Sequence, residues 1–409
     1  KATVIKDIVE GEENSATPAT CLQKHPNIEV VVDEGASQEL TRVKTPWLVG
    51  TCLWPERFIR TAVLWLCRKV DKPILKLTYQ DYIDNRLGQL LEATGQTYDM
   101  INIQVFNDLQ HTISGWPGGK PNADDSTRPE RATPYPKRVL IFSPHPDDDV
   151  ISMGGTFIRL IAQGHDVHVA YQTSGNIAVL DDIVLQTLDT ARECGFVDRY
   201  NEVQEIINNK KKGEAEPIEL RRLKGSIRRA EAKAACRQMG LTDPSHVHFL
   251  NLPFYETGGV KKGLLTDKDI QIVVDLLREI KPHQIYAAGD LSDPHGTHRV
   301  CIEAVLAAME VVQDEEWVKE CRLWLYRGAW QEWDLDMVDM AVPLSPDEVI
   351  QKRHAIYRHL SQKDIVPFPG EDKREFWQRA EERNQNTARL YDKLGMAEYQ
   401  AIEVFVRLF

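Results

Sequence analysis

The sequence lacks long apolar runs and is poor in cysteine. Its longest apolar candidate, residues 61–67, ends at Arg68, well short of the about 18 residues that a membrane-spanning helix needs. The seven cysteines are scattered and contain no C-x-x-C pair, which argues against both a disulfide framework and a cysteine zinc site. We therefore expect a protein without a membrane span, placed in a reducing, cytoplasmic compartment.

Positive charge is also in the minority. The chain has 50 Lys and Arg against 62 Asp and Glu, a net charge of −12. This balance argues against nucleic acid or an anionic membrane as the main partner. With 409 residues, of which 42% are hydrophobic, the chain is long enough for two domains, or for one domain with a large appendage.

The pattern along the chain divides it into four parts. Residues 1–45 hold one helix, from Val4 to Glu10, and one β-branched strand at residues 28–33, too little to bury a core alone. Residues 46–114 form a helical connector, with apolar residues at helical spacing between 55 and 95. Residues 115–136 are rich in proline and glycine and predict an extended linker. The boundary to the main domain, residues 137–409, follows this linker.

Strands and helices alternate in the main domain. Strands are expected at 138–143, 166–172, 246–250, 284–288 and 322–326, and helices at 154–163, 219–239, 267–280 and 297–312. The charged stretch 201–216 is expected to be an exposed loop. This rhythm predicts an α/β fold: a Rossmann-like, mostly parallel sheet flanked by helices, with an N-terminal helical and extended appendage.

The end of the first expected strand carries the densest polar cluster. His145 and the carboxylates Asp147, Asp148 and Asp149 follow it within one turn. So much negative charge is costly unless a cation compensates it, and imidazole with carboxylate suits Zn²⁺. One aspartate would satisfy a helix cap, but three with a histidine exceed that need. We therefore favour a metal site over a cap.

Two further clusters add candidates. His295 and His298, after the strand 284–288, are three residues apart at a helix start and can face the same side. Because parallel strands end at one sheet edge, they are expected beside His145. Arg228 and Glu231 form an i, i+3 pair that is either a solvated salt bridge or a substrate anchor. Histidines 165, 168, 246 and 248 are expected to be structural, whereas histidines 354 and 359 fit either role.

These motifs together resemble the PIG-L/LmbE-like deacetylases. The resemblance rests on S-P-H-P-D-D-D at 143–149, G-G-T at 154–156, Arg228-x-x-Glu231, His295-x-x-His298 and H-x-S-Q at 359–362, and it covers about residues 137–409. It implies a zinc-dependent hydrolase that removes acyl groups from N-acetylated amino sugars.

The resemblance also implies site residues. His145, Asp148 and His298 would ligate Zn²⁺ or another divalent metal, and Asp147 would be the general base. His295 would stabilise the oxyanion and protonate the leaving amine. Arg228 would contact the small-molecule substrate, an amino sugar of the N-acetylglucosamine type.

Residues 1–45 carry a second resemblance. Pro18–Pro26, Val30–Asp33 and Glu39–Thr41 are similar to the closing segment of glucosamine-6-phosphate deaminases. It implies a deacetylase joined to a deaminase, in amino-sugar metabolism, with homo-oligomer formation through the deaminase-like part. Two alternatives stay open: an accessory or docking module within a deaminase fusion, or a metal site that is only structural and closed by a fourth ligand.

Overall fold

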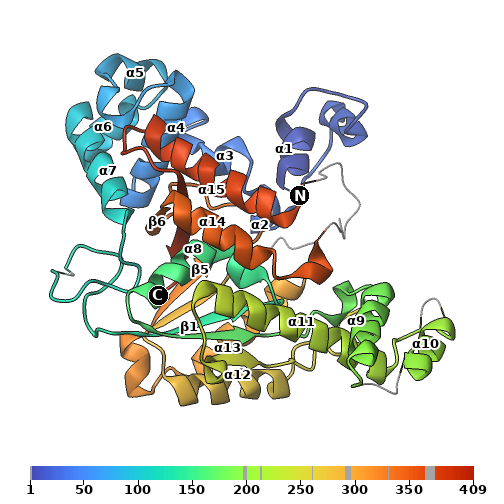
Figure 1. Ribbon diagram of the computed structural model, residues 1–409. Coiled ribbons are helices and arrows are strands. Elements are labelled where there is room, and N and C mark those ends of the chain that lie inside the picture. Colours follow the sequence, from blue (N-terminus) through green and yellow to red (C-terminus); the bar gives the residue numbers. More distant parts are fainter. Residues whose placement is uncertain are drawn as a thin grey trace. The chain divides into compact units, whose positions relative to one another are not determined.

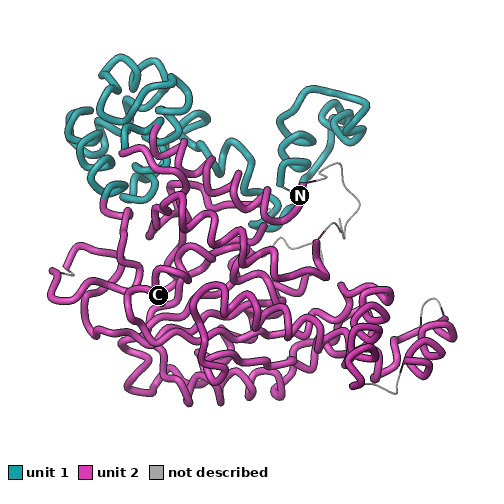
Figure 2. The backbone as a smooth tube through the Cα atoms, viewed as in Figure 1, with its two compact units in different colours: residues 1–110, 393–396 teal, residues 111–392, 397–409 magenta. Residues whose placement is uncertain are grey.

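The computed structural model describes residues 2–124, 126–196, 200–211, 214–259, 261–290, 296–329, 331–363 and 374–409. The chain forms two compact units (Figure 2). Unit 1 comprises residues 1–110 and 393–396, and unit 2 comprises residues 111–392 and 397–409. The expected four-part division, with boundaries at residues 45, 114 and 136, stays a prediction.

Unit 1 is helical. Its elements are α1 (Ala2–Glu10), η1 (Pro18–Lys24), α2 (Glu34–Ser37), α3 (Thr41–Lys44), η2 (Pro46–Leu48), α4 (Glu56–Val70), η3 (Ile74–Lys76), α5 (Tyr79–Asp84), α6 (Gly88–Thr94) and α7 (Tyr98–Thr112). The helix expected at Val4–Glu10 is present. The strand expected at residues 28–33 is wrong, because this segment pairs with no strand and Val31 is 87% exposed. Asp33 instead caps α2 by accepting from the Ala36 N–H at 2.7 Å.

Unit 2 is built on a seven-stranded sheet in the order β3-β2-β1-β4-β5-β7-β6. Its strands are β1 (Arg138–Ser143), β2 (Asp166–Tyr171), β3 (Val247–Phe249), β4 (Gln284–Ala288), β5 (Arg322–Tyr326), β6 (Met340–Leu344) and β7 (Ala401–Arg407). Strands β1 to β5 pair in parallel, whereas β7 is antiparallel to both β5 and β6. The expected mostly parallel α/β sheet is confirmed.

Helices cover both faces of this sheet (Figure 1). They are α8 (Asp148–Ala162), α9 (Asp181–Glu193), α10 (Tyr200–Asn208), α11 (Ile218–Met239), α12 (Asp267–Ile280), α13 (Thr297–Val312), α14 (Pro346–Ile356) and α15 (Phe376–Lys393), with short η4 (Asn176–Ala178), η5 (Pro244–His246), η6 (Glu316–Glu320) and η7 (Leu360–Gln362). The expected bounds of α12, α13, β1, β4 and β5 match the structure.

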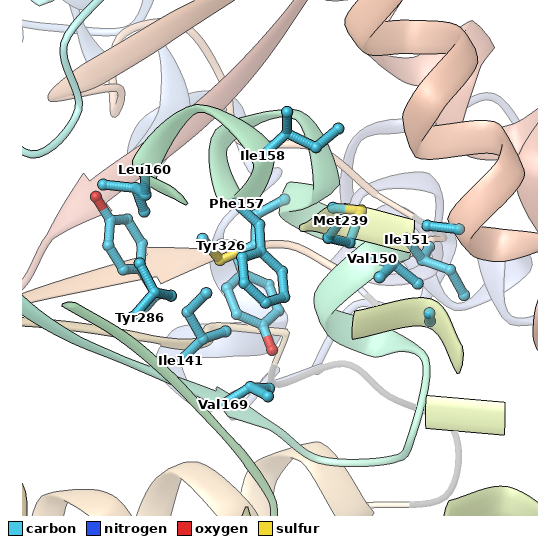
Figure 3. Close-up of a cluster of buried hydrophobic side chains, with 14 of the residues drawn as sticks. Ile141, Val150, Ile151, Phe157, Ile158, Leu160, Val169, Met239, Tyr286 and Tyr326 are labelled. Atoms are coloured by element: carbon cyan, nitrogen blue, oxygen red, sulfur yellow. The ribbon is translucent and has the colours of Figure 1, made fainter. Parts of the chain in front are cut away.

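Alternation along the strands separates the core into two layers. Val139 and Ile141 of β1 face α8, α11 and α14, in the cluster that Figure 3 shows around Phe157 and Tyr326. Leu140 and Phe142 face α12 and α13 on the opposite side. Because both faces are buried, β1 reads as a continuous apolar run, as parallel strands do.

Two local expectations in unit 2 are wrong. Residues 200–208 form helix α10 instead of an exposed loop, because Val203, Ile206 and Ile207 recur at helical spacing and pack with α9. The antiparallel strands β6 and β7 were not expected. Among the described residues, β6 follows β5 with no helix between them, and β7 follows α15 at the end of the chain, so neither fits the alternation of strand and helix on which the prediction was based.

Helix α8 begins at Asp148, before the expected start at Gly154, and it is broken at Met153 (φ −136°, ψ 25°). The break frees backbone N–H groups within the helix. Glu403 of β7 accepts from the N–H groups of Gly155 and Thr156 at 3.0 and 2.7 Å, and from Lys352 at 2.7 Å. The Glu403 and Lys352 side chains are only 1% and 2% exposed.

Both glycines at the break are required by close packing. A Cβ at Gly154 would lie 2.8 Å from Lys352, and one at Gly155 would lie 2.4 Å from Leu344. The G-G-T motif therefore lets α14 and β6 approach the second segment of α8.

All seven cysteines are free, as expected. None of the helices among the described residues has both the length and the apolar character required to cross a membrane.

Two neutral histidines hold the first residues of the central strand. His165 accepts from the Lys137 N–H, and His283 accepts from the Arg138 N–H, each at Nδ1 over 3.0 Å. Burial lowers the pKa of each imidazole from 6.5 to about 4. Protonation would remove the acceptor nitrogen, so the folded state favours the neutral form.

We expect His165 to make unit 2 sensitive to acid. Because its pKa is lowered from 6.5 to about 4 in the folded state, its stabilising contribution is complete above about pH 6.5 and is lost as the pH falls towards about 4. The loss is on the order of 3 kcal/mol. Chemical denaturation between pH 4 and 7 should show a flatter pH dependence for His165→Gln than for the wild type. The exposed His111→Gln variant should keep the wild-type slope; equal slopes for all three proteins would contradict the assignment.

Candidate metal centre

The turn between β1 and α8 is held by its own side chains. Ser143 Oγ donates to the His145 carbonyl at 2.6 Å and accepts from the Asp149 N–H at 3.1 Å. Asp149 is fully buried and accepts from the Tyr171 hydroxyl at 2.9 Å. Burial raises the pKa of Asp149 to about 7. Asp149 therefore stabilises the turn, and its carboxyl group points into the core and not towards solvent.

His145, Asp148 and His298 converge at the carboxyl ends of β1 and β4. One donor atom of each lies within 4.8 Å of the others. Asp148 Oδ2 is 3.1 Å from His145 Nδ1 and 3.2 Å from His298 Nε2, and these two nitrogens are 3.3 Å apart. The two loops expected to meet at this sheet edge do so.

These separations fit a tetrahedral ion. Two bonds of about 2.1 Å at the tetrahedral angle place their ligand atoms about 3.4 Å apart, close to all three distances. Two imidazole nitrogens facing each other and a shared carboxylate are a donor set that suits Zn²⁺. Among the described residues this group has three members, which would leave a coordination position open.

The electrostatics of Asp148 support the same interpretation. Burial acts to raise the pKa of its carboxyl, but His298 and His145 outweigh burial and hold that pKa well below its usual range. The carboxylate is also oriented by the His145 N–H, which donates to Oδ2 at 2.8 Å. Asp148 is thus ionised and fixed in place.

Asp147 and Arg228 form a buried pair beside this group. Arg228 Nη2 lies 3.1 Å from Asp147 Oδ2, with side chains only 1% and 9% exposed, and it also donates to the Pro146 carbonyl at 2.9 Å. The interpretation of Arg228 and Glu231 as a solvated salt bridge is therefore wrong. Glu231 instead accepts from the Ser361 N–H and hydroxyl at 2.6 and 2.7 Å.

His359 is the residue beside this site whose role the sequence left open. It is 3% exposed, and among the described residues neither ring nitrogen has a hydrogen-bond partner. Burial lowers its pKa to about 4, so the ring is neutral at pH 7. A small cavity reaches from Asp147 past His359 to Tyr357, Phe376 and Trp377. The H-x-S-Q motif at 359–362 was the sequence signal that could have placed His359 beside this site. Ser361 of this motif donates to Glu231 of α11, the helix that also carries Arg228.

His295 lies outside the described residues, so its expected role stays a prediction. Arg228 Nε and Nη1 are buried and have no hydrogen-bond partner among the described residues. An arginine with two unused donor nitrogens is suited to bind an oxygen-rich ligand.

The sheet and the histidine–aspartate cluster together form an α/β domain with a candidate metal centre. Residues 140–309 match the model of the PIG-L family, described as GlcNAc-PI de-N-acetylase. This part of the chain is a PIG-L domain, as the resemblance of its motifs predicted.

Among curated proteins, one relative matches nearly the whole of this chain and another matches a short segment of it. The chain is 53% identical over 418 residues to a putative glucosamine-6-phosphate deaminase-like protein of Bacteroides thetaiotaomicron; the match covers 99% of this chain and 63% of the relative. The chain thus spans less than two thirds of that protein. A glucosamine-6-phosphate deaminase of Lactobacillus helveticus is 50% identical over 40 residues, 10% of this chain and 17% of that protein. The likeness to deaminases is weak and short.

Solved structures also resemble the chain. The N,N′-diacetylchitobiose deacetylase of Pyrococcus horikoshii is 20% identical with a TM-score of 0.42, covering 66% of this chain and 84% of its own. A 4-carboxy-2-hydroxymuconate hydratase of Pseudomonas putida is 17% identical with a TM-score of 0.44, covering 67% and 96%.

We expect His298→Ala to lose a bound divalent ion. Removing a direct ligand should weaken zinc binding by more than the about 10- to 100-fold that outer partners contribute. Equilibrium dialysis against zinc, followed by elemental analysis, measures the change. The exposed His354→Ala variant should bind zinc as the wild type does. Unchanged zinc affinity in folded His298→Ala would contradict the ligand assignment.

Proposed function

We propose that unit 2 is a metal-dependent hydrolase that removes the acyl group from an N-acetylated amino sugar of the N-acetylglucosamine type. The observation that carries the proposal is the convergence of His145, Asp148 and His298, with donor atoms 3.1 to 3.3 Å apart, directly beside the Asp147 carboxylate. The description of the PIG-L family as a de-N-acetylase supports the reaction class.

His145, Asp148 and His298 would hold the ion. When bound, a divalent metal lowers the pKa of a coordinated water and polarises a carbonyl oxygen. Asp147 would accept the proton of the attacking water as general base. Arg228 fixes the Asp147 carboxylate through the 3.1 Å contact. His295 would protonate the leaving amine, so that the amide C–N bond breaks to give a carboxylate and a free amine.

The side chains around the small cavity beside Asp147 would contact the sugar. Phe376 and Trp377, which line this cavity, offer apolar faces to a sugar ring. His359 offers both a donor and an acceptor nitrogen, and Arg228, which contacts Asp147, has two nitrogens with unused N–H groups. Such a set of convergent polar groups with an apolar wall is typical of a small-molecule site.

Asp147→Asn tests the proposed base. We expect the variant to keep its bound zinc, because Asp147 is not a member of the ligand group, and to lose about 10²- to 10⁴-fold in kcat. Acetate release from N-acetylglucosamine and its 6-phosphate measures the effect, with zinc content and circular dichroism as controls. A folded, zinc-loaded variant with near wild-type turnover would show that another group is the base.

His359→Ala tests the cavity. We expect a five- to tenfold lower kcat/KM, because a hydrogen bond between neutral groups contributes about 1 kcal/mol, with zinc content unchanged. His359→Gln, which keeps a donor and an acceptor, should recover part of the loss. His354→Ala, on the exposed side of α14, is the matched control. If His359→Ala hydrolyses N-acetylglucosamine and its 6-phosphate as the wild type does, the substrate does not reach this cavity.

The name of the Bacteroides relative favours a second candidate. In this alternative, the chain is an accessory or docking part of a glucosamine-6-phosphate deaminase fusion. The two proposals differ in their product: a deacetylase releases acetate, whereas a deaminase releases ammonia. Ammonia released from glucosamine-6-phosphate by the full-length protein, without acetate release from N-acetylglucosamine or its 6-phosphate, would favour the accessory role.

A further inference from the structure

A second cluster of histidines lies at the opposite edge of the sheet. Asp166 and His168 are the first and third residues of β2, and His246 and His248 flank the first residue of β3. Because β2 and β3 run parallel to β1, this cluster lies at their amino ends, whereas the candidate metal centre lies at the carboxyl ends. Alternation places all four side chains on one face.

The three imidazoles form a stack across the two strands. The rings of His168 and His246 are 4.2 Å apart between centroids, and those of His168 and His248 are 5.3 Å apart, both at 27°. His168 thus packs against both other rings, so that the three imidazoles form one group.

Asp166 lies between two of these rings. Its Oδ1 is 3.4 Å from His168 Nε2 and 3.7 Å from His246 Nδ1, and the three donor atoms lie within 4.8 Å of one another. Both separations are close to the about 3.4 Å between neighbouring ligand atoms of a tetrahedral zinc ion. His246 Nδ1 also lies 3.2 Å from the Val167 carbonyl oxygen, a contact that an ion on this nitrogen would replace.

The second ring nitrogen of His168 has a hydrogen-bond partner. His168 Nδ1 lies 3.1 Å from His248 Nε2, whereas His246 Nε2 lies 3.9 Å from Asp243 Oδ2, beyond hydrogen-bond distance. A histidine that ligates a metal through one nitrogen commonly donates its other N–H to such a partner, which fixes the tautomer. Glu279 adds a further negative charge near His168 and His248. The surroundings of the cluster therefore resemble the outer contacts of a metal site.

We propose that Asp166, His168 and His246 bind a second divalent transition-metal ion, with His248 as the outer hydrogen-bond partner of His168 and Asp243 as a nearby negative charge. Two imidazoles and one carboxylate suit Zn²⁺ and disfavour Mg²⁺, which prefers oxygen ligands. The ligands are partly exposed, with side-chain exposures of 43%, 14% and 27%, so solvent completes the coordination. The ion joins the edge strand β3 to β2 and stabilises this end of the sheet.

Zinc stoichiometry separates this site from the candidate metal centre. After removal of metal by a chelator and dialysis against zinc, we expect about two ions per wild-type chain and about one per chain of His298→Ala. The His168→Gln/His246→Gln variant should also bind about one ion, and the variant with all three changes should bind none. Asp166→Asn, which preserves the shape of the site, serves as a second probe if the double variant is unstable. His354→Ala is the matched histidine control.

Thermal unfolding adds an independent readout, since an ion that binds only the folded state raises Tm. In the His298→Ala background, zinc should still raise Tm, whereas magnesium should not, and the shift should vanish when His168 and His246 are also replaced. A single zinc ion per wild-type chain that is lost in His298→Ala would overturn the proposal. So would a second ion that persists in folded His168→Gln/His246→Gln or in folded Asp166→Asn.

Discussion

The geometry of unit 2 depends on one buried carboxylate. Glu403 binds the N–H groups that the break in α8 leaves without helical partners, and Lys352 balances its charge at 2.7 Å. Burial of such a pair is costly unless its remaining hydrogen bonds are made, and here Thr156 Oγ1 also donates to Glu403 at 2.6 Å. Loss of either partner would leave an uncompensated charge in the core, so the two residues form one structural unit.

The segment of α8 before the break carries one residue of the candidate metal centre. The first segment of the helix, with Asp148 and Asp149, takes its own direction and turns one carboxylate towards His145 and His298 and the next towards Tyr171. Two adjacent aspartates therefore acquire opposite environments: the pKa of Asp148 is held low, and that of Asp149 is raised to about 7. Asp148 is therefore a charged candidate ligand, whereas Asp149, the next aspartate, is a buried structural residue.

The sequence contained enough information for the parallel part of the fold and for the meeting of two loops, because strand alternation and polar residues after strand ends are local signals. It could not reveal that Arg228 pairs with Asp147, because that contact joins residues 81 positions apart (228 − 147) in a fold whose loops set the distance. The strand predicted at residues 28–33 was wrong because a local signal was present without a tertiary one. Their β-branched residues favour a strand, but a strand also needs a neighbouring strand to pair with. The role of Glu403 was hidden because its strand is an antiparallel addition at the end of the chain.

The two edges of the sheet have a consequence for assembly. Strand β3 has only three residues, and the other edge strand, β6, carries Pro343, which has no N–H to donate. Short edges and edge prolines prevent the backbone of another molecule from adding a further strand. Growth of the sheet from molecule to molecule is thereby blocked at both ends, and any association of unit 2 with another copy has to use side chains on its helices or loops.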